Sequence, residues 1–176
     1  MPQHSDYAVP VRDELDSLFV VTADERERGV SLPPTGGSLY REFESSMADE
    51  LAASPAGVAA QLTDALVETL ELAESARPET DAENGLVRVE VSGATYGPLD
   101  RFDDPVVSFL AVGLADALGA PVAVEVRPGA GGDEFVVTFE WDPERAADGE
   151  GEGEREQEFE SEPGTEPETG PDPESE

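Results

Sequence analysis

The sequence predicts an α+β fold in which amphipathic helices pack on a small antiparallel sheet. The first observation is an apolar pattern over residues 104–118 with the 3.6-residue spacing of a helix. The second is a pair of segments, 121–127 and 134–141, in which apolar and polar residues alternate around a glycine-rich turn. The third is two further helical patterns before Pro78. Helices grouped with antiparallel strands are typical of the α+β class.

The N-terminal segment, residues 1–37, is expected to be a lead-in with one helix. Apolar residues at helical spacing favour a helix over 11–21, although Leu18–Thr22 fits a strand equally well. Residues 23–37 combine a charged run with proline and glycine pairs, which predicts a loop.

Two amphipathic helices are expected next, over residues 38–53 and 55–76. Ser38 can cap the first, and Ser54-Pro55 opens the second with a serine cap before a proline. Their apolar stripes are Tyr40, Phe43, Met47 and Leu51, and then Val58, Leu62, Leu66, Leu70 and Ala73. An acidic loop is expected over 78–85.

A strand over 86–92 is predicted because Val87, Val89 and Val91 alternate with Arg88 and Glu90. The pattern leaves open whether residues 94–99 form another strand.

The central helix over 104–118 has defined ends. Asp104 supplies a side-chain cap, and Pro105 stands at the first helical position. Gly119 can take a left-handed conformation after the last turn, and Pro121 prevents the helix from continuing.

The composition changes after Trp141, at the start of an acidic C-terminal tail. Residues 142–176 carry 15 acids against two arginines and have almost no apolar residue to bury. A disordered tail is therefore expected, with the domain confined to residues 38–141. The tail is interpreted as a solubilising appendage, with an acidic arm for a basic partner as the alternative.

The formal net charge is −32, and all 10 basic residues are arginines. Acidic surfaces without lysine are typical of salt-accumulating cytoplasms, so a haloarchaeal or similar source is expected. At molar salt the Debye length is about 3 Å, and surface carboxylates hardly repel one another. The same charge argues against nucleic acid and anionic membranes as partners, because binding either needs clustered cations, which this acidic sequence does not supply.

The chain contains no cysteine, which excludes disulfides and thiolate metal sites. No metal and no other cofactor is expected. The first residues do not read as a signal peptide, and no apolar run approaches the roughly 18 residues that span a bilayer. A soluble cytoplasmic protein is the expectation.

Several of these features follow one another in a recognisable order. Two helices and a strand precede the sequence DPVVSF at 104–109, a buried helix, a valine strand, and a Gly132-Asp133 turn before Phe139-Glu140-Trp141. That order resembles the 4-vinyl reductase domain family, which is related to the small subunits of the TRAPP tethering complex and to archaeal regulators. The likeness covers residues 38–141 and is best over 104–141.

Members of that family tend to carry one cysteine at the start of the buried helix and one in the last strand, and some are thought to use them for metal. Here the first position is Val107, and the second falls near Val136 or Val137, with one residue too many after the turn. The resemblance thus implies a relative without the thiols or a metal role. It still implies helices and an antiparallel sheet that enclose an apolar pocket for a small molecule.

Residues with chemical potential also have structural interpretations. His4, the single histidine, lies near the N-terminus, where a general base is not held in place. Asp103 and Asp104 are interpreted as a helix cap, with a catalytic or cation site as the alternative. The glycine-rich run at 129–132 lies between two strands without a following helix, so a hairpin turn is favoured over a phosphate loop.

A ligand pocket is expected where the loop before the central helix meets that helix. Tyr96 and Arg101 lie in this loop, and Arg101 either holds an anion of a ligand or partner or makes a routine surface ion pair. Phe109, Leu110 and Leu114 are expected to wall the pocket, with a fully packed core as the alternative.

The leading hypothesis is a non-enzymatic small-molecule-binding or regulatory module with an apolar pocket. The alternative is a protein–protein adaptor or complex subunit that uses its helical face, as the likeness to TRAPP subunits implies. A hydrolase or lyase using carboxylates ranks last, because no Ser/His/Asp set, metal-ligand cluster or nucleotide loop is present. The expected partner is a small apolar molecule or a protein, and a homodimer is a further option.

Overall fold

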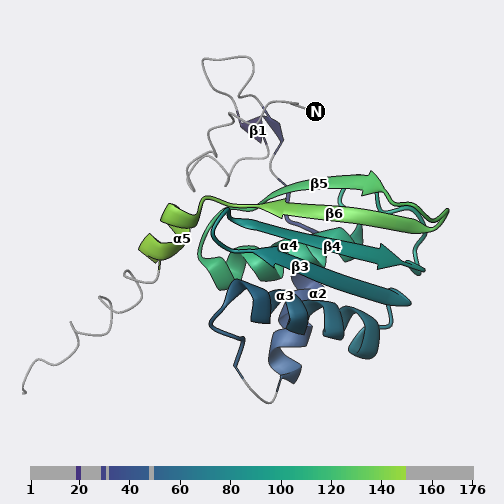
Figure 1. Ribbon diagram of the computed structural model, residues 1–176, viewed down its shortest axis with the longest axis horizontal. Coiled ribbons are helices and arrows are strands. Elements are labelled where there is room, and N and C mark those ends of the chain that lie inside the picture. The colour runs from purple at the N-terminus through teal and green to yellow at the C-terminus, as the bar shows by residue number, and fades with distance from the viewer. Residues whose placement is uncertain (1–18, 21–28, 31, 48–49, 150–176) are drawn as a thin grey trace, which may run out of the picture.

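A computed structural model of the chain describes residues 19–20, 29–30, 32–47 and 50–149 (Figure 1). Its main body is a four-stranded antiparallel sheet with helices packed on one face, which confirms the predicted α+β class. The elements of this body are α2 (Gly36–Ser46), α3 (Pro55–Asp64), the π-helical turn η2 (Ala65–Thr69), β3 (Ser75–Asp81), β4 (Leu86–Ser92), α4 (Pro105–Leu118), β5 (Ala123–Pro128), β6 (Glu134–Glu140) and α5 (Pro143–Gly149).

The strand order in the sheet is β3-β4-β6-β5, with every neighbouring pair antiparallel. β4 and β6 lie in the centre, where Val89 stands opposite Val137. The chain leaves β4 through α4, reaches the edge strand β5 and returns as β6. Because β6 fits between β4 and β5, α4 must cross the face of the sheet, and this places it in the core.

The core lies between the sheet and the three helices α2, α3 and α4. Val87, Val89 and Val91 are at most 1% exposed, whereas Arg88 and Glu90 between them are exposed on the other face. Phe109 of α4 is fully buried and meets Phe43 of α2 edge to face, with ring centroids 5.8 Å apart. The alternation of β4 and the stripe of α4 thus face each other, as their patterns predict.

The predicted ends of the central helix are confirmed. Asp104 Oδ1 accepts a hydrogen bond from Val106 N at 3.0 Å, and Pro105 stands at the first helical position. Gly119 follows the helix with φ of 58°, in the left-handed region. The predicted strand over 86–92 and the glycine-rich hairpin turn after residue 128 are also confirmed.

The predicted helix over 55–76 is confirmed as far as Thr69, and the predicted loop over 78–85 is confirmed for the turn at 82–85, but both are wrong where β3 lies. The helix ends after η2, and Glu71 reverses the chain with φ of 50°. A seven-residue strand, β3, follows from Ser75, and in it Pro78 stands opposite Val89. Proline is tolerated here because β3 is an edge strand, so the missing N–H does not interrupt a ladder on both sides.

The helix predicted over 38–53 begins and ends earlier than expected. α2 starts at Gly36 and stops at Ser46, where Met47 takes an extended conformation. Residues 48–49 lie outside the described part. The non-helical segment beyond them is held by Gln61, whose Oε1 accepts from Ala52 N at 2.7 Å. This side-chain bond replaces the helical one that the segment lacks.

The helix predicted over 11–21 is wrong at its described end. Phe19–Val20 form strand β1 and pair antiparallel with strand β2, Gly29–Val30, in the segment predicted as a loop. The rest of that predicted helix, residues 11–18 and 21, lies outside the described residues. Residues 94–99, left open by the sequence, contain turns and bends and no strand.

The expected disorder from residue 142 does not hold for α5. Glu144 N donates to Asp142 Oδ1 at 3.0 Å, which caps this short helix, and Ala146 packs against the core. The folded part therefore extends beyond the predicted boundary at 141. Residues 150–176, the remainder of the predicted tail, lie outside the described part.

Candidate functional site

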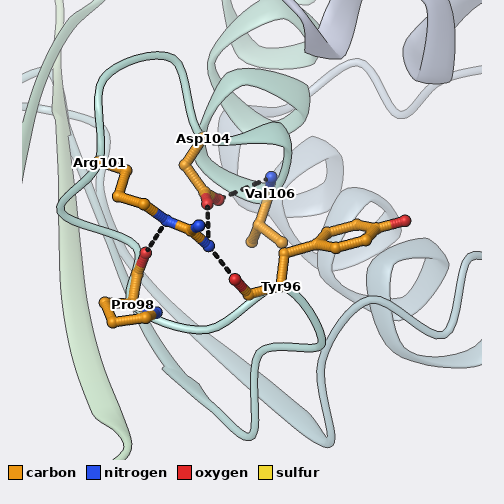
Figure 2. Close-up of polar contacts among 5 residues, drawn as sticks. All are labelled: Tyr96, Pro98, Arg101, Asp104 and Val106. Atoms are coloured by element: carbon orange, nitrogen blue, oxygen red, sulfur yellow. Dashed lines mark hydrogen bonds and ion pairs between the residues drawn. The ribbon is translucent and has the colours of Figure 1, made fainter.

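The loop before α4 holds two of the predicted site residues, Tyr96 and Arg101 (Figure 2). The Arg101 guanidinium donates from Nε to Pro98 O at 3.1 Å and from Nη2 to Tyr96 O. Figure 2 shows the Tyr96 ring directed away from this guanidinium, and Tyr96 is 55% exposed. Arg101 thus stabilises the loop internally, because its guanidinium donates to two main-chain carbonyls of the same loop.

Arg101 also lies near the buried carboxylate that caps α4. Its Nη2 is 3.9 Å from Asp104 Oδ2, and Asp104 is 3% exposed. Within the described residues this Oδ2 atom accepts no hydrogen bond, so the nearby guanidinium is its main charge compensation. Of the two predicted roles of Arg101, the geometry shows the ion pair.

Asp103, the other half of the predicted cap, ties α4 to α2 instead. Its carboxylate accepts from Thr35 N at 2.9 Å through Oδ2 and also accepts the Thr35 hydroxyl. Burial acts to raise the Asp103 pKa, but the hydrogen bonds from Thr35 and Ser108 outweigh it and leave the pKa below its usual value. Asp103 and Asp104 therefore both have structural partners. The backbone at Asp103 has φ of 51°, in the turn that precedes α4.

The other three predicted site residues lie in the core. Phe109, Leu110 and Leu114 are at most 1% exposed and belong to the cluster between the sheet and the helices. The structure therefore brings Tyr96 and Arg101 together in the loop and places the three apolar residues in the packed core. Their ligand-binding role stays a prediction.

A cavity of about 340 Å³ lies at the opposite end of α4. Its walls come from the segment that leads into α3, the β3–β4 turn, the last turn of α4, the end of β6, and α5. The lining residues are Ala52, Ala53, Ser54, Pro55, Val58, Ala82, Asp116, Ala117, Leu118, Gly119, Trp141, Pro143 and Ala146. None of the five predicted site residues is among them. Fourteen residues of α4 separate its two ends, about 20 Å of helix.

The cavity is lined mostly by apolar side chains, with Val58 and Trp141 as buried residues and alanines at its rim. Two polar side chains reach it. Ser54 Oγ accepts from Gly57 N at 3.2 Å and so caps α3. Asp116 Oδ2 accepts the hydroxyl of Tyr40 at 2.8 Å, and burial together with this carboxylate raises the Tyr40 pKa above its usual value.

A match to a known family accounts for most of the chain. The model of the family described as "Domain of unknown function (DUF7982)" matches residues 1–141. The chain belongs to this family. The comparison with curated proteins finds no match, and neither does the comparison with solved structures.

The DUF7982 match ends at Trp141, inside the wall of the cavity. Pro143 and Ala146, which complete the wall, come from α5 beyond the matched residues. The sequence contained a signal for α5, because Asp142-Pro143 repeats the cap-and-proline start of α4 at Asp104-Pro105. That signal was outweighed by the acidic composition of the tail.

Among the residues that the structure describes, no three His, Cys, Asp or Glu side chains gather as a metal site. Among the helices of the described part, none is both long and apolar enough to cross a membrane.

Proposed function

We propose that this DUF7982 protein is a non-enzymatic module that binds or senses a small apolar molecule in the cavity at the end of α4. The observation that supports this is the cavity itself, a half-open pocket of about 340 Å³, within the size range of small-molecule sites, whose lining side chains are mostly apolar while polar atoms make up about half of its accessible wall. Burial of an apolar molecule against Val58, Leu118 and Trp141 supplies the driving force.

The chemistry of the walls limits the ligand. Asp116 is the single charged side chain among the lining residues, and it lies beside apolar atoms of Ala117 and Leu118 on the same helix. A neutral molecule of about the size of a substituted benzene ring, with at most one hydroxyl or amine for Asp116, fits this lining. A carboxylate or phosphate ligand would meet Asp116 without a compensating cation in the lining.

We assign no catalysis to this cavity, because both polar side chains that line it already have structural partners. Ser54 caps α3, and Asp116 accepts the Tyr40 hydroxyl. A serine nucleophile needs an adjacent general base that activates it, and Ser54 Oγ instead accepts from Gly57 N. Kinship with the 4-vinyl reductase domain, a halophilic cytoplasm as the setting and a regulatory role are parts of the same proposal.

The single tryptophan makes the cavity measurable without a label. Trp141 lines it and is 7% exposed, so a bound molecule changes the surroundings of the indole. We expect toluene and cyclohexanol, added separately in molar KCl, to change Trp141 emission saturably and to raise the melting temperature by mass action.

Ala117→Phe fills the cavity from the exposed side of α4, and Ala60→Phe is the matched control. Ala60 is also exposed on a helix, α3, but does not line the cavity. Ala60→Phe is expected to respond to both probes as the wild type does, and Ala117→Phe to lose the response. A wild type without a saturable response, or equal responses of the two variants, would refute the site.

The second candidate, a protein–protein adaptor, is favoured by two exposed aromatic residues near the start of α4. Phe102 is 75% exposed and Tyr96 is 55% exposed, and both belong to the loop that Arg101 fastens. Aromatic residues held on a rigid loop are common anchors of interfaces. Native mass spectrometry separates the candidates: a retained small molecule supports the module, and a stoichiometric second protein lost in Phe102→Ser supports the adaptor.

A further inference from the structure

The face of the sheet that points away from α2, α3 and α4, here called the outer face, carries an ordered charge pattern. Strand register places its side chains in rows across the sheet. The first row is Arg77, Glu90, Val136 and Arg127, in the strand order β3, β4, β6, β5. The second row is Glu79, Arg88, Thr138 and Glu125. All six charged side chains are exposed.

The second row is the charge inverse of the first. Arg77 neighbours Glu79 on β3, Glu90 neighbours Arg88 on β4, and Arg127 neighbours Glu125 on β5, while β6 contributes uncharged residues to both rows. Arg127 Nη2 already lies 2.8 Å from Glu125 Oε1 within the chain. The two rows together have no net charge, in a chain whose net charge is −32.

We propose that the outer face is the interface of a homodimer. A two-fold axis that runs across the strands between the two rows places the first row of one copy over the second row of the other. Arg77 then faces Glu79 of the second copy, Glu90 faces Arg88, and Arg127 faces Glu125. A two-fold interface needs such a self-complementary surface, since each contact between two positions occurs twice.

The expected partner is a second copy because the charge pattern is complementary to itself under the two-fold rotation. A strongly acidic chain repels another copy over most surfaces, and these two rows are a region where that repulsion is replaced by pairing. Val136 and Thr138 provide an uncharged strip in the middle, where close approach costs little desolvation.

The same geometry predicts that the dimer is weak and depends on salt. Four strands about 4.8 Å apart and six or seven residues long cover roughly 450 Å² per copy, below the roughly 800 Å² per partner of a standard interface and in the range of weak ones. The axis also places Glu134 opposite Glu140 of the second copy at the rim, where like charges need screening. Molar KCl should therefore promote association, because it screens the overall repulsion more than the enclosed pairs.

The decisive test uses two charge reversals at the central strand, where sheet twist displaces the pairs least. Arg88→Glu alone leaves carboxylates facing each other across the interface at positions 88 and 90. Glu90→Arg alone leaves guanidinium groups facing each other at the same two positions, so each variant repels itself. Mixed together, the two variants restore opposite charges in a heterodimer. Sedimentation equilibrium of the full chain in molar KCl measures each variant, their mixture and the wild type.

We expect wild-type self-association, about tenfold or more weaker association of each variant alone, and recovery in the equimolar mixture. Arg41→Glu and Glu42→Arg make the same charge changes on exposed positions of α2 and should associate like the wild type. A monomeric wild type, unchanged association of the sheet variants, or no recovery on mixing would overturn the proposal. Recovery itself shows that both variants are folded, and toluene binding at the cavity is independent of every outcome.

Discussion

Gly36 and Gly37 are neighbours in the first turn of α2, but only Gly36 touches α4. Its N–H donates to Ser108 Oγ at 2.9 Å. A Cβ at Gly36 would lie 2.1 Å from Phe109 N and 2.3 Å from the Ser108 carbonyl carbon. A Cβ at Gly37 would meet nothing closer than Pro34 Cγ at 3.8 Å, an ordinary contact. The same replacement by alanine should therefore have opposite effects at the two positions.

The cost of Gly36→Ala follows from the atoms that clash. They belong to the backbone of α4, so no side-chain rotation relieves them, and α2 must move by about 1 Å or more to restore normal contact distances. Overpacking of this kind costs about 1–3 kcal/mol, and the loss of the bond to Ser108 costs about 1 kcal/mol. The better helix propensity of alanine offsets about 1 kcal/mol. We expect a net loss of about 1–3 kcal/mol.

Gly37→Ala keeps the propensity gain without the clash, and its stability should rise by up to about 1 kcal/mol. Urea unfolding in molar KCl, followed by Trp141 emission and by circular dichroism, measures both variants against the wild type. Equal free energies of unfolding for the two variants would show that α2 does not dock on α4 through Gly36, and the packing argument would fail.

Two further predictions concern Tyr40 and the C-terminal segment. The Tyr40 pKa is raised, so the folded state holds this proton more tightly than the unfolded state does. The stability that results is complete below pH 10, where the tyrosine is protonated in both states. Above pH 10 the free energy of unfolding falls, by at most about 1.4 kcal/mol per pH unit. Tyr40→Phe should flatten that decline in urea unfolding between neutral and strongly alkaline pH, and parallel profiles would contradict it. Deletion of 150–176 should keep the melting temperature within about one degree, whereas deletion of 143–176 should lower it, because Ala146 packs against the core. Scanning calorimetry compares the two truncations, and equal melting temperatures would mean that α5 contributes nothing.

The sequence by itself determined the elements whose signals are local. α4 has a side-chain cap, a proline at its start, an apolar stripe and a glycine at its end, and each of these acts within a few residues. β4 has strict alternation, and the β5–β6 hairpin has its glycine-rich turn. Such signals predict the element and the face that it buries, and with them the α+β class.

The tertiary structure decided what depends on partners distant in the sequence. The sequence of β3 predicts the end of a helix and an acidic loop. It forms a strand because it pairs with β4 at the edge of the sheet, where Pro78 is tolerated. The segment that the sequence assigns to the end of the first amphipathic helix is non-helical at Ala52, whose N–H donates to Gln61 from another helix. Side-chain spacing cannot reveal either partner.

The candidate site shows the same division. The sequence indicated an apolar pocket on α4, but the helix has two ends, and its periodicity does not distinguish a packed turn from one that faces a cavity. The structure packs Phe109 and Leu114 into the core and leaves the space beside Leu118 and Trp141. Likewise, the sequence shows Arg88 and Glu90 only as two charged residues on one strand. The register with β3 and β6 places them in rows across the sheet. Only the fold brings such distant residues together, because contacts between elements depend on how their surfaces fit.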